Sequence, residues 1–115
     1  MALGETHNKA EAVFADSRIV AVDQAQVVGF CERAIASPRG RYRLCSHQAS
    51  DSIHEMLICL DEKTFVRPHK HQGKSESIHV ISGLARLILF DEQGQITNLV
   101  ALGPYESGRT FFHRI

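Results

Sequence analysis

Two histidines that lie one residue apart, directly after a proline, constrain the fold of this chain more than any other feature. The segment runs Pro68-His69-Lys70-His71, and Glu76 follows it after a short polar stretch. The residue before a proline avoids the helical region, and alternate side chains of an extended segment point to the same face. We therefore expect His69 and His71 to project together, with Lys70 on the other face.

The polar stretch after His71 predicts a turn. Gln72-Gly73-Lys74-Ser75 would reverse the chain, and the run from Glu76 to Ser82 predicts a return strand beside the first. Such a return would bring Glu76 next to both imidazoles. Two imidazoles and one carboxylate suit one divalent first-row metal ion, with open positions for water or a substrate. His69, His71 and Glu76 are therefore the candidate metal ligands.

The competing interpretation is that His69 and His71 are unrelated surface histidines in a loop and that Glu76 is a solvated carboxylate. An isolated pair of histidines would favour that interpretation. The proline before them and the strand-like pattern around them favour the metal hypothesis instead. A carboxylate buried in a barrel would be costly unless it bound a metal ion or accepted hydrogen bonds. No separate acid–base residue stands out, so the catalytic residues stay unassigned.

Residues 23–40 predict one helix near the N-terminus. Asp23 is a typical N-cap, and Gln26, three residues later, completes a capping box. Apolar residues follow at helical spacing. The helix should end near Ser37, because Pro38 cannot comfortably continue it.

Residues 41–115 change to a period of two, which is typical of strands. Many short strands at near-even spacing, separated by turns, predict an antiparallel double-sheet barrel or jelly roll. Residues 1–22 are expected to form an N-terminal arm, in which Ser17 to Val22 is compatible with an edge strand because it is short, apolar and β-branched. The chain is thus expected to be one domain made of an arm, a helix and a barrel.

The motif and its surroundings resemble the cupins. His69, His71, Glu76 and Gly83 match the first metal-binding motif of that superfamily, H-x-H, four residues, E, six residues, G, with Lys63 where a glycine usually stands. The flanking segments are similar to those of the WbuC-type cupin-fold metalloproteins, over roughly Asp23 to Ile115. Those segments are R-x-R-x-C-x-H-Q (Arg41 to Gln48), H-E-M-L-I (His54 to Ile58), R-P-H-K-H, G-K-S-E-S, I-L-F-D-E-Q-G (Ile88 to Gly94) and L-G-P-Y-E-S-G (Leu102 to Gly108).

The resemblance implies a mainly β fold, an antiparallel double-stranded jelly-roll (cupin) barrel with one N-terminal helix. It implies one divalent metal ion, Zn, Fe, Mn or Ni, and a small-molecule ligand. The WbuC type points to a small sugar or sugar-nucleotide in surface polysaccharide (O-antigen/LPS) biosynthesis, with a metal-dependent isomerase, epimerase or dioxygenase as the reaction class. The alternative is a non-catalytic metal- or sugar-binding or sensing module, and a third is a truncated cupin that only dimerises.

Four basic side chains are candidate substrate contacts. Arg43 and His47 share one face of an alternating segment and could line the pocket, although salt bridges on a sheet surface are the default. Arg67 flanks the two histidines and could contact an anionic ligand, although a solvated role is at least as common. Lys74 lies at the turn beside Glu76.

Cupins also carry a second motif with a proline and another histidine, which usually completes the metal site. It should follow a segment like Thr110 to Ile115, and this chain ends at Ile115. We therefore expect the fourth ligand and the C-terminal strands to be absent from this chain, and we assign His113 to an ordinary strand. A barrel without its last strands would expose an apolar edge, so we expect a homodimer.

Composition excludes several classes of partner. Thirteen basic and thirteen acidic side chains cancel, so charge gives no case for binding nucleic acid or an anionic membrane. No apolar run reaches the ~18–20 residues of a transmembrane helix, and the N-terminus has no secretory pattern. Three widely spaced cysteines indicate free thiols in a reducing compartment. These observations predict a cytoplasmic protein.

Overall fold

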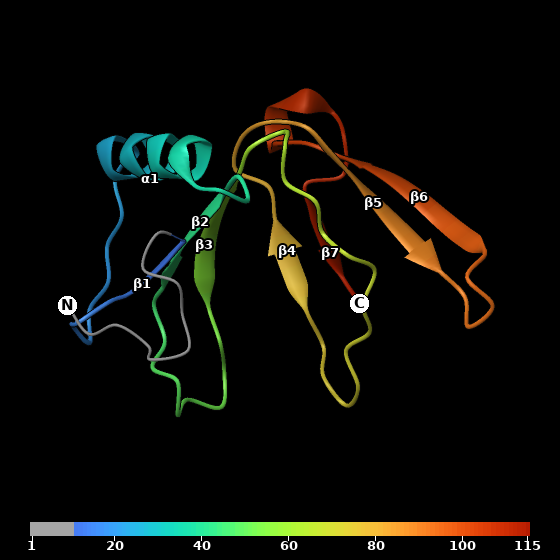
Figure 1. Cartoon of the computed structure of the whole chain (residues 1–115), viewed down its shortest axis with the longest axis horizontal. Helices are drawn as coiled ribbons and strands as arrows, with labels where there is room; N and C mark the ends of the chain where they lie inside the picture. The colour runs from blue at the N-terminus through green and yellow to red at the C-terminus, as the bar shows by residue number, and fades with distance from the viewer. Residues whose placement is uncertain (1–10) are drawn as a thin grey trace. The chain divides into compact units, whose positions relative to one another are not determined.

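The computed structural model describes residues 11–115, which fall into two compact units (Figure 1). The first unit ends at Arg67 and the second is Pro68–Ile115. Residues 1–10 of the predicted N-terminal arm lie outside the described residues. The division falls directly before the two candidate histidines, so all three candidate metal ligands belong to the second unit.

The first unit is a three-stranded sheet with one helix. The strands are β1 (Ala12–Phe14), β2 (Arg41–Cys45) and β3 (Met56–Leu60), in the order β1-β2-β3. β1 runs parallel to β2, and β2 runs antiparallel to β3. The core lies between helix and sheet, where Ala34, Tyr42 and Cys59 are buried.

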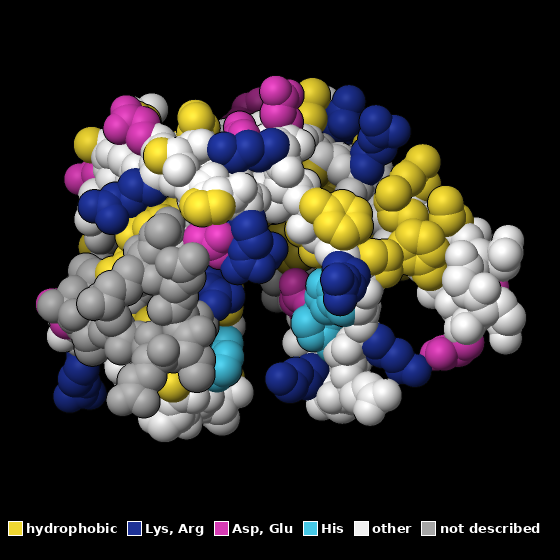
Figure 2. Space-filling model, in the orientation of Figure 1, with side chains coloured by type: hydrophobic (Ala, Val, Ile, Leu, Met, Phe, Trp, Pro, Cys, Tyr) yellow, Lys and Arg dark blue, Asp and Glu magenta, His cyan; other side chains and the backbone are white. Residues whose placement is uncertain are grey.

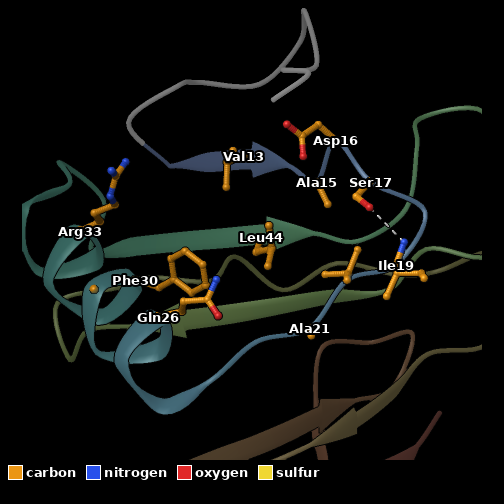
Figure 3. Close-up of a pocket in the computed structure, with 12 residues that line it drawn as sticks. Val13, Ala15, Asp16, Ser17, Ile19, Ala21, Gln26, Phe30, Arg33 and Leu44 are labelled. Atoms are coloured by element: carbon orange, nitrogen blue, oxygen red, sulfur yellow. Dashed lines mark hydrogen bonds between the residues drawn. The ribbon is translucent and has the colours of Figure 1, made fainter.

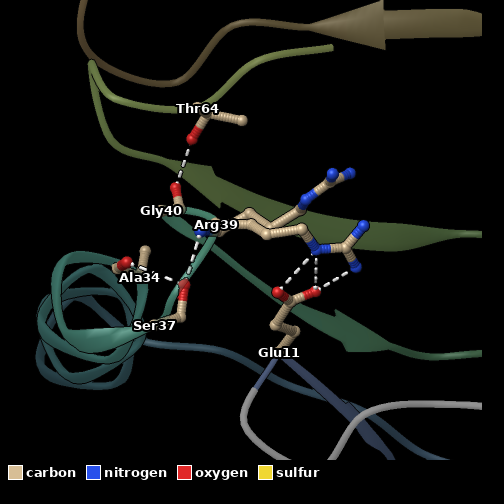
Figure 4. Close-up of polar contacts among 7 residues, drawn as sticks. Glu11, Ala34, Ser37, Arg39, Gly40 and Thr64 are labelled. Carbon is tan, nitrogen blue, oxygen red and sulfur yellow. Dashed lines mark hydrogen bonds and ion pairs between the residues drawn. The ribbon is translucent and has the colours of Figure 1, made fainter. Parts of the chain in front are cut away.

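The helix α1 (Gln24–Ala36) confirms the predicted start and end. Asp23 accepts a hydrogen bond from the backbone N–H of Gln26 at 2.9 Å, and the Gln26 side chain accepts one from the Asp23 N–H at 2.9 Å. This reciprocal pair is the predicted capping box. At the other end, Ser37 Oγ donates to the Ala34 carbonyl and accepts from the Arg41 N–H at 2.8 Å, which links the helix end to β2 (Figure 4).

Gly40 lies in the tight connection between α1 and β2. Its φ is +69°, a left-handed conformation that glycine adopts without strain. Its carbonyl accepts hydrogen bonds from the Asp61 N–H and from the Thr64 hydroxyl (Figure 4). A Cβ on Gly40 would lie 2.9 Å from Thr64 Oγ1 and 2.7 Å from Lys63 Cγ. This position therefore requires glycine for both its conformation and its close packing.

The N-terminal arm differs from the prediction. Residues 17–22 form bends and coil, not an edge strand. The edge strand is β1, five residues earlier, and it pairs with β2 through the register Ala12–Arg43 to Phe14–Cys45. β1 is buried at both ends, whereas Ile19 is 85% exposed. The prediction for residues 17–22 was wrong because β-branched composition does not show whether a segment finds a partner strand.

The second unit contains two separate two-stranded ribbons. β4 (Ser77–His79) pairs antiparallel with β7 (Phe112–Arg114), and β5 (Ala85–Phe90) pairs antiparallel with β6 (Ile96–Leu102). A 3-10 helix, η1 (Tyr105–Ser107), lies in the connection between β6 and β7. The predicted hairpin turn before β6 is confirmed, with Gly94 at φ +80°.

The segment that carries the two histidines also differs from the prediction. Residues 64–71 form no strand, and the partner of β4 is β7. Pro68 has no backbone N–H to donate to a ladder, which weakens this segment as a partner strand. We predicted that the strand beginning at Glu76 would pair with a strand of residues 64–71, and that prediction was wrong.

The coarse fold prediction is confirmed: the chain is mainly β, with one helix and small antiparallel sheets. The residues that the structure describes form no closed barrel. The jelly-roll arrangement stays a prediction.

Candidate functional site

In the second unit, the His71 side chain contacts both His69 and Glu76. Nε2 of His69 lies 3.1 Å from Nε2 of His71, and the same Nε2 of His71 lies 2.6 Å from Oε2 of Glu76. The two imidazole rings are 4.8 Å apart at 75°, so their nitrogen edges meet while their faces do not stack. His71 and Glu76 are each about one-third exposed, at 33% and 37%. The cluster is thus open to solvent.

Two local features bring Glu76 to the histidines. Gly73, at φ +67°, forms the reversal between the two arms of the cluster. Glu76 then joins the end of the β4–β7 ribbon, because its N–H donates to the Ile115 carbonyl and its carbonyl accepts from the Ile115 N–H, both at 2.9 Å. The ribbon therefore fixes the backbone of Glu76, and the turn returns His71 to it.

The contacts of His71 Nε2 cannot all be ordinary hydrogen bonds. A ring nitrogen is either a donor or an acceptor. If His71 Nε2 carries the proton that it donates to Glu76, it has no lone pair for His69 Nε2. If it lacks that proton, it repels the carboxylate. One proton on His71 Nε2 would therefore have to be shared between two acceptors, Glu76 Oε2 and His69 Nε2.

The separations in this cluster can be compared with those of a metal site. Ligand atoms about 2.0–2.2 Å from one tetrahedral metal ion lie roughly 3.3–3.6 Å from one another. The distance between His69 Nε2 and His71 Nε2, 3.1 Å, is close to this range, whereas the distance between His71 Nε2 and Glu76 Oε2, 2.6 Å, is shorter. Within residues 11–115, however, no group of three or more His, Cys, Asp or Glu side chains has the arrangement of a complete metal site. The cluster thus has one separation close to that of two metal ligands, and it is not a closed three-ligand site.

The β4–β7 ribbon adds a residue that the sequence interpretation assigned to an ordinary strand. His113 on β7 faces Ile78 on β4 in the register. Nδ1 and Nε2 of His113 are both buried and have no hydrogen-bond partner among the described residues. Alternation along β7 would have placed His113 on the face of Ile115, but only the pairing with β4 shows that Glu76 shares this face.

The four candidate substrate contacts divide between the units. Lys74 is exposed at the turn of the second unit, and Arg67 is exposed at the end of the first. Arg43 lies on β2, where its N–H donates to the Glu11 carbonyl. The substrate-binding roles of these side chains stay predictions.

His47, the fourth candidate, is part of the first unit's own packing. It is 7% exposed, and its Nδ1 contacts both the N–H and the carbonyl of Glu55 at 3.1 and 3.0 Å. Its ring stacks on His54 at 4.1 Å and meets Phe14 edge-on at 5.6 Å. These contacts give His47 a structural role that the sequence did not predict.

A pocket of about 400 Å³ lies in the first unit (Figure 3). Apolar side chains such as Phe30 and Leu44 line it together with the polar Gln26 and Arg33. None of the candidate metal or substrate residues lines this pocket. It is therefore a feature separate from the histidine cluster.

The three cysteines are free thiols. Cys31 on α1 and Cys59 on β3 bring their sulfur atoms to 3.2 Å. Burial, together with the adjacent Cys31, raises the pKa of Cys59 to about 12. Burial also raises the pKa of Cys45. A thiol with a raised pKa carries little thiolate at neutral pH, so Cys45 and Cys59 are core residues.

Within residues 11–115, no helix has the length and apolar character needed to cross a bilayer. The α-helix described within this range, α1, has 13 residues.

Comparisons with known proteins give one match. Residues 22–102 match the model of a family described as a domain of unknown function, DUF6016. No curated protein and no solved structure matches the chain. The matched residues include α1, the two histidines, Glu76 and both strands of the β5–β6 ribbon. Because the match spans well over half of the chain, the protein belongs to the DUF6016 family.

Proposed function

We propose that this protein binds one divalent metal ion through His69, His71 and Glu76. The observation that carries the proposal is the convergence of their electron-rich atoms, with separations of 3.1 and 2.6 Å around His71 Nε2. A cation can take the place of a proton shared at that nitrogen, because all three side chains can donate lone pairs to it. Two imidazoles and a carboxylate suit Zn, Fe, Mn or Ni, and they leave positions open for a ligand.

The proposal also includes a specific fold, the jelly-roll barrel of the cupins. Small antiparallel sheets, one helix and an H-x-H…E cluster are what a jelly-roll cupin of the WbuC type would contain. The proposed ligand is a small sugar or sugar-nucleotide of surface polysaccharide biosynthesis, in the cytoplasm, where free thiols persist. A bound divalent ion would supply Lewis-acid or redox chemistry for an isomerase, epimerase or dioxygenase.

The three proposed ligands differ in the charge that they bring to the ion. His69 and His71 hold the ion through neutral imidazoles, and Glu76 adds the negative charge. The exposed ammonium of Lys74, two residues before Glu76, is suited to an anionic group such as the phosphate of a sugar-nucleotide.

The alternative is a module that holds a metal or a sugar without turnover. Its supporting observation is the open character of the cluster, in which His71 and Glu76 are each about one-third exposed. Enzymes that polarise a substrate usually exclude water from the reacting centre. Steady-state turnover of sugar-nucleotides by the metal-loaded chain separates the two: an enzyme converts its substrate, whereas a binding module shows saturable binding and no product.

The metal proposal is tested by titrating the metal-free chain with Zn²⁺ and measuring heat. We expect one tight site, lost in His69→Ala and in His71→Ala, because each variant removes one of three ligands. The far-ultraviolet circular dichroism of both variants should match that of the parent, because both side chains lie outside the strands. The matched control is His79→Ala. His79 packs against Phe112 at 4.7 Å, so this variant should leave the Zn²⁺ affinity unchanged. Stoichiometric tight binding in both His69 and His71 variants would refute the assignment.

A further inference from the structure

The β4–β7 ribbon has an apolar face that carries two polar side chains. Opposed residues of an antiparallel pair project to the same face, as do alternate residues of one strand. The backbone bonds between Glu76 and Ile115 and the bond from Val80 N–H to the Phe111 carbonyl extend the register of β4 and β7 in both directions. One face therefore carries Ile78, Val80, Phe111 and Ile115, together with Glu76 and His113.

The opposite face confirms this register. His79 and Phe112 are paired across the ribbon, and their rings contact at a centroid distance of 4.7 Å. They alternate with Ile78 and His113, so they point away from Glu76. The ribbon thus has one histidine on each face, His79 away from the cluster and His113 on its side.

His113 is costly where it lies. Both of its ring nitrogens are buried, and neither has a hydrogen-bond partner within residues 11–115. A neutral imidazole carries one donor and one acceptor, and burying such groups without partners is unfavourable. An apolar residue would suit the surrounding Ile78, Phe111 and Ile115 better, so the imidazole itself calls for a functional explanation.

His113 is also within reach of the cluster. Glu76 pairs with Ile115 and Ile78 pairs with His113, so Glu76 and His113 are diagonal neighbours on one face. Diagonal neighbours are separated by about 7–8 Å, a distance that long side chains can bridge. A divalent ion beside the Glu76 carboxylate would therefore be approached from β7 by the His113 ring.

We propose that His113 is the fourth protein ligand of the ion held by His69, His71 and Glu76, an inference that rests on the metal site proposed above. The ring nitrogen without a proton would donate its lone pair to the ion, which gives that nitrogen a partner while the other keeps its proton. Three imidazoles and one carboxylate would then hold the ion: His69 and His71 from the segment before the turn, Glu76 from the residue before β4, and His113 from β7. A four-ligand set of this kind holds zinc firmly and leaves expansion to a fifth ligand as the route for a bound substrate.

The experiment compares four chains by Zn²⁺ titration and by the visible absorption of bound Co²⁺. They are the parent chain, His113→Phe, His69→Ala and the opposite-face control His79→Phe. We expect His113→Phe to bind Zn²⁺ more than about 100-fold more weakly, beyond the ~10–100-fold effect of an outer contact, and to change the Co²⁺ spectrum. The control should keep both properties.

Thermal unfolding supplies a second measurement, in which His113→Phe should change the Tm differently with and without Zn²⁺. His113→Phe should raise the Tm of the metal-free chain, because it removes two unpartnered buried nitrogens, while it abolishes the increase in Tm that Zn²⁺ gives the parent. If His113→Phe does not fold, His113→Gln, with a single amide of lower metal affinity, is measured in its place and should lose Zn²⁺ affinity in the same way.

The outcomes separate this inference from the metal site itself. Zn²⁺ affinity within about 3-fold of the parent in the His113 variants, with loss in His69→Ala, would overturn the role of His113 and keep the site. Weaker binding with an unchanged Co²⁺ spectrum would also overturn it, because His113 would then only position another ligand. A parent chain that binds no Zn²⁺ would overturn both proposals together.

Discussion

Glu11 is a buried carboxylate that depends on one partner. Its side chain is 6% exposed and forms an ion pair with Arg39, whose Nε donates to Oε1 at 2.8 Å (Figure 4). The hydrogen bond from Arg39 lowers the pKa of Glu11 below its ordinary value of 4.5, and burial opposes this effect. The ion pair links the residue before β1 to the connection between α1 and β2, so it attaches the edge strand to the first unit.

This ion pair predicts a pH-dependent loss of stability. The pKa of Glu11 is lower in the folded chain than in the unfolded chain, so its contribution is fully present above 4.5 and is lost as the pH falls through the folded-state pKa. We expect Arg39→Gln to lower the Tm at neutral pH and to have a progressively smaller effect in acid. Thermal unfolding over a pH series measures this. Arg18→Gln, at an exposed position, is the control; a penalty for Arg39→Gln that stays constant down to strong acid would contradict the prediction.

Replacing either of two glycines in the first unit with alanine should change the stability of the chain, in opposite directions. Gly29 lies inside α1, and a Cβ there would meet nothing within 4 Å. Gly29→Ala should stabilise the chain by about 0.5–1 kcal/mol, because alanine loses less entropy in a helix. Gly40→Ala should destabilise it by about 1–2 kcal/mol, because φ is +69° and the new Cβ would meet Thr64 Oγ1. Urea unfolding measures both, and effects of the same sign would contradict the account.

Elements defined by local chemistry were predictable from the sequence. The capping box at Asp23 and Gln26 gave the start of α1, because both hydrogen bonds join residues three apart. Gly94 and the polar residues around it gave the turn between β5 and β6. Ser37, before a proline, gave the end of the helix. Such signals need no knowledge of distant partners.

Elements defined by distant partners were not predictable. β1 forms because it pairs with β2, whose paired residues lie 31 positions later in the sequence (Ala12–Arg43 to Phe14–Cys45), and no pattern in the arm indicates this. His71 does contact both His69 and Glu76, but the strand pairing that we expected to bring them together does not form. The real partner of β4 is β7, so the position of His113 beside Glu76 depended on a long-range register.

For the molecule as a whole, the main exposed apolar face that we consider is on the β5–β6 hairpin. Ile88 pairs with Leu99 and Phe90 with Ile96 on one face, and they are 42%, 59%, 44% and 63% exposed. Figure 2 shows hydrophobic side chains gathered over this hairpin. A contiguous exposed apolar patch is typical of an interaction surface, and a second copy of the chain is the partner that the sequence predicts.

We therefore expect the chain to self-associate through this face. Sedimentation velocity over a range of concentrations should show a dimer that Leu99→Lys shifts towards monomer, because the charge would be buried against apolar side chains. Val28→Lys is the matched control, since Val28 is 52% exposed on α1, an element of the first unit. A dimer that Leu99→Lys leaves intact would assign the contact to another surface, and a monomer at every concentration would contradict self-association.

Metal content of the purified chain tests the central claim most directly. Elemental mass spectrometry of the protein, purified without chelators or affinity resins that carry metal, should find close to one divalent first-row ion per chain. The same measurement on His69→Ala should find almost none, while His79→Ala should match the parent. Absence of metal from the parent, or equal metal in the parent and in His69→Ala, would contradict a site formed by His69, His71 and Glu76.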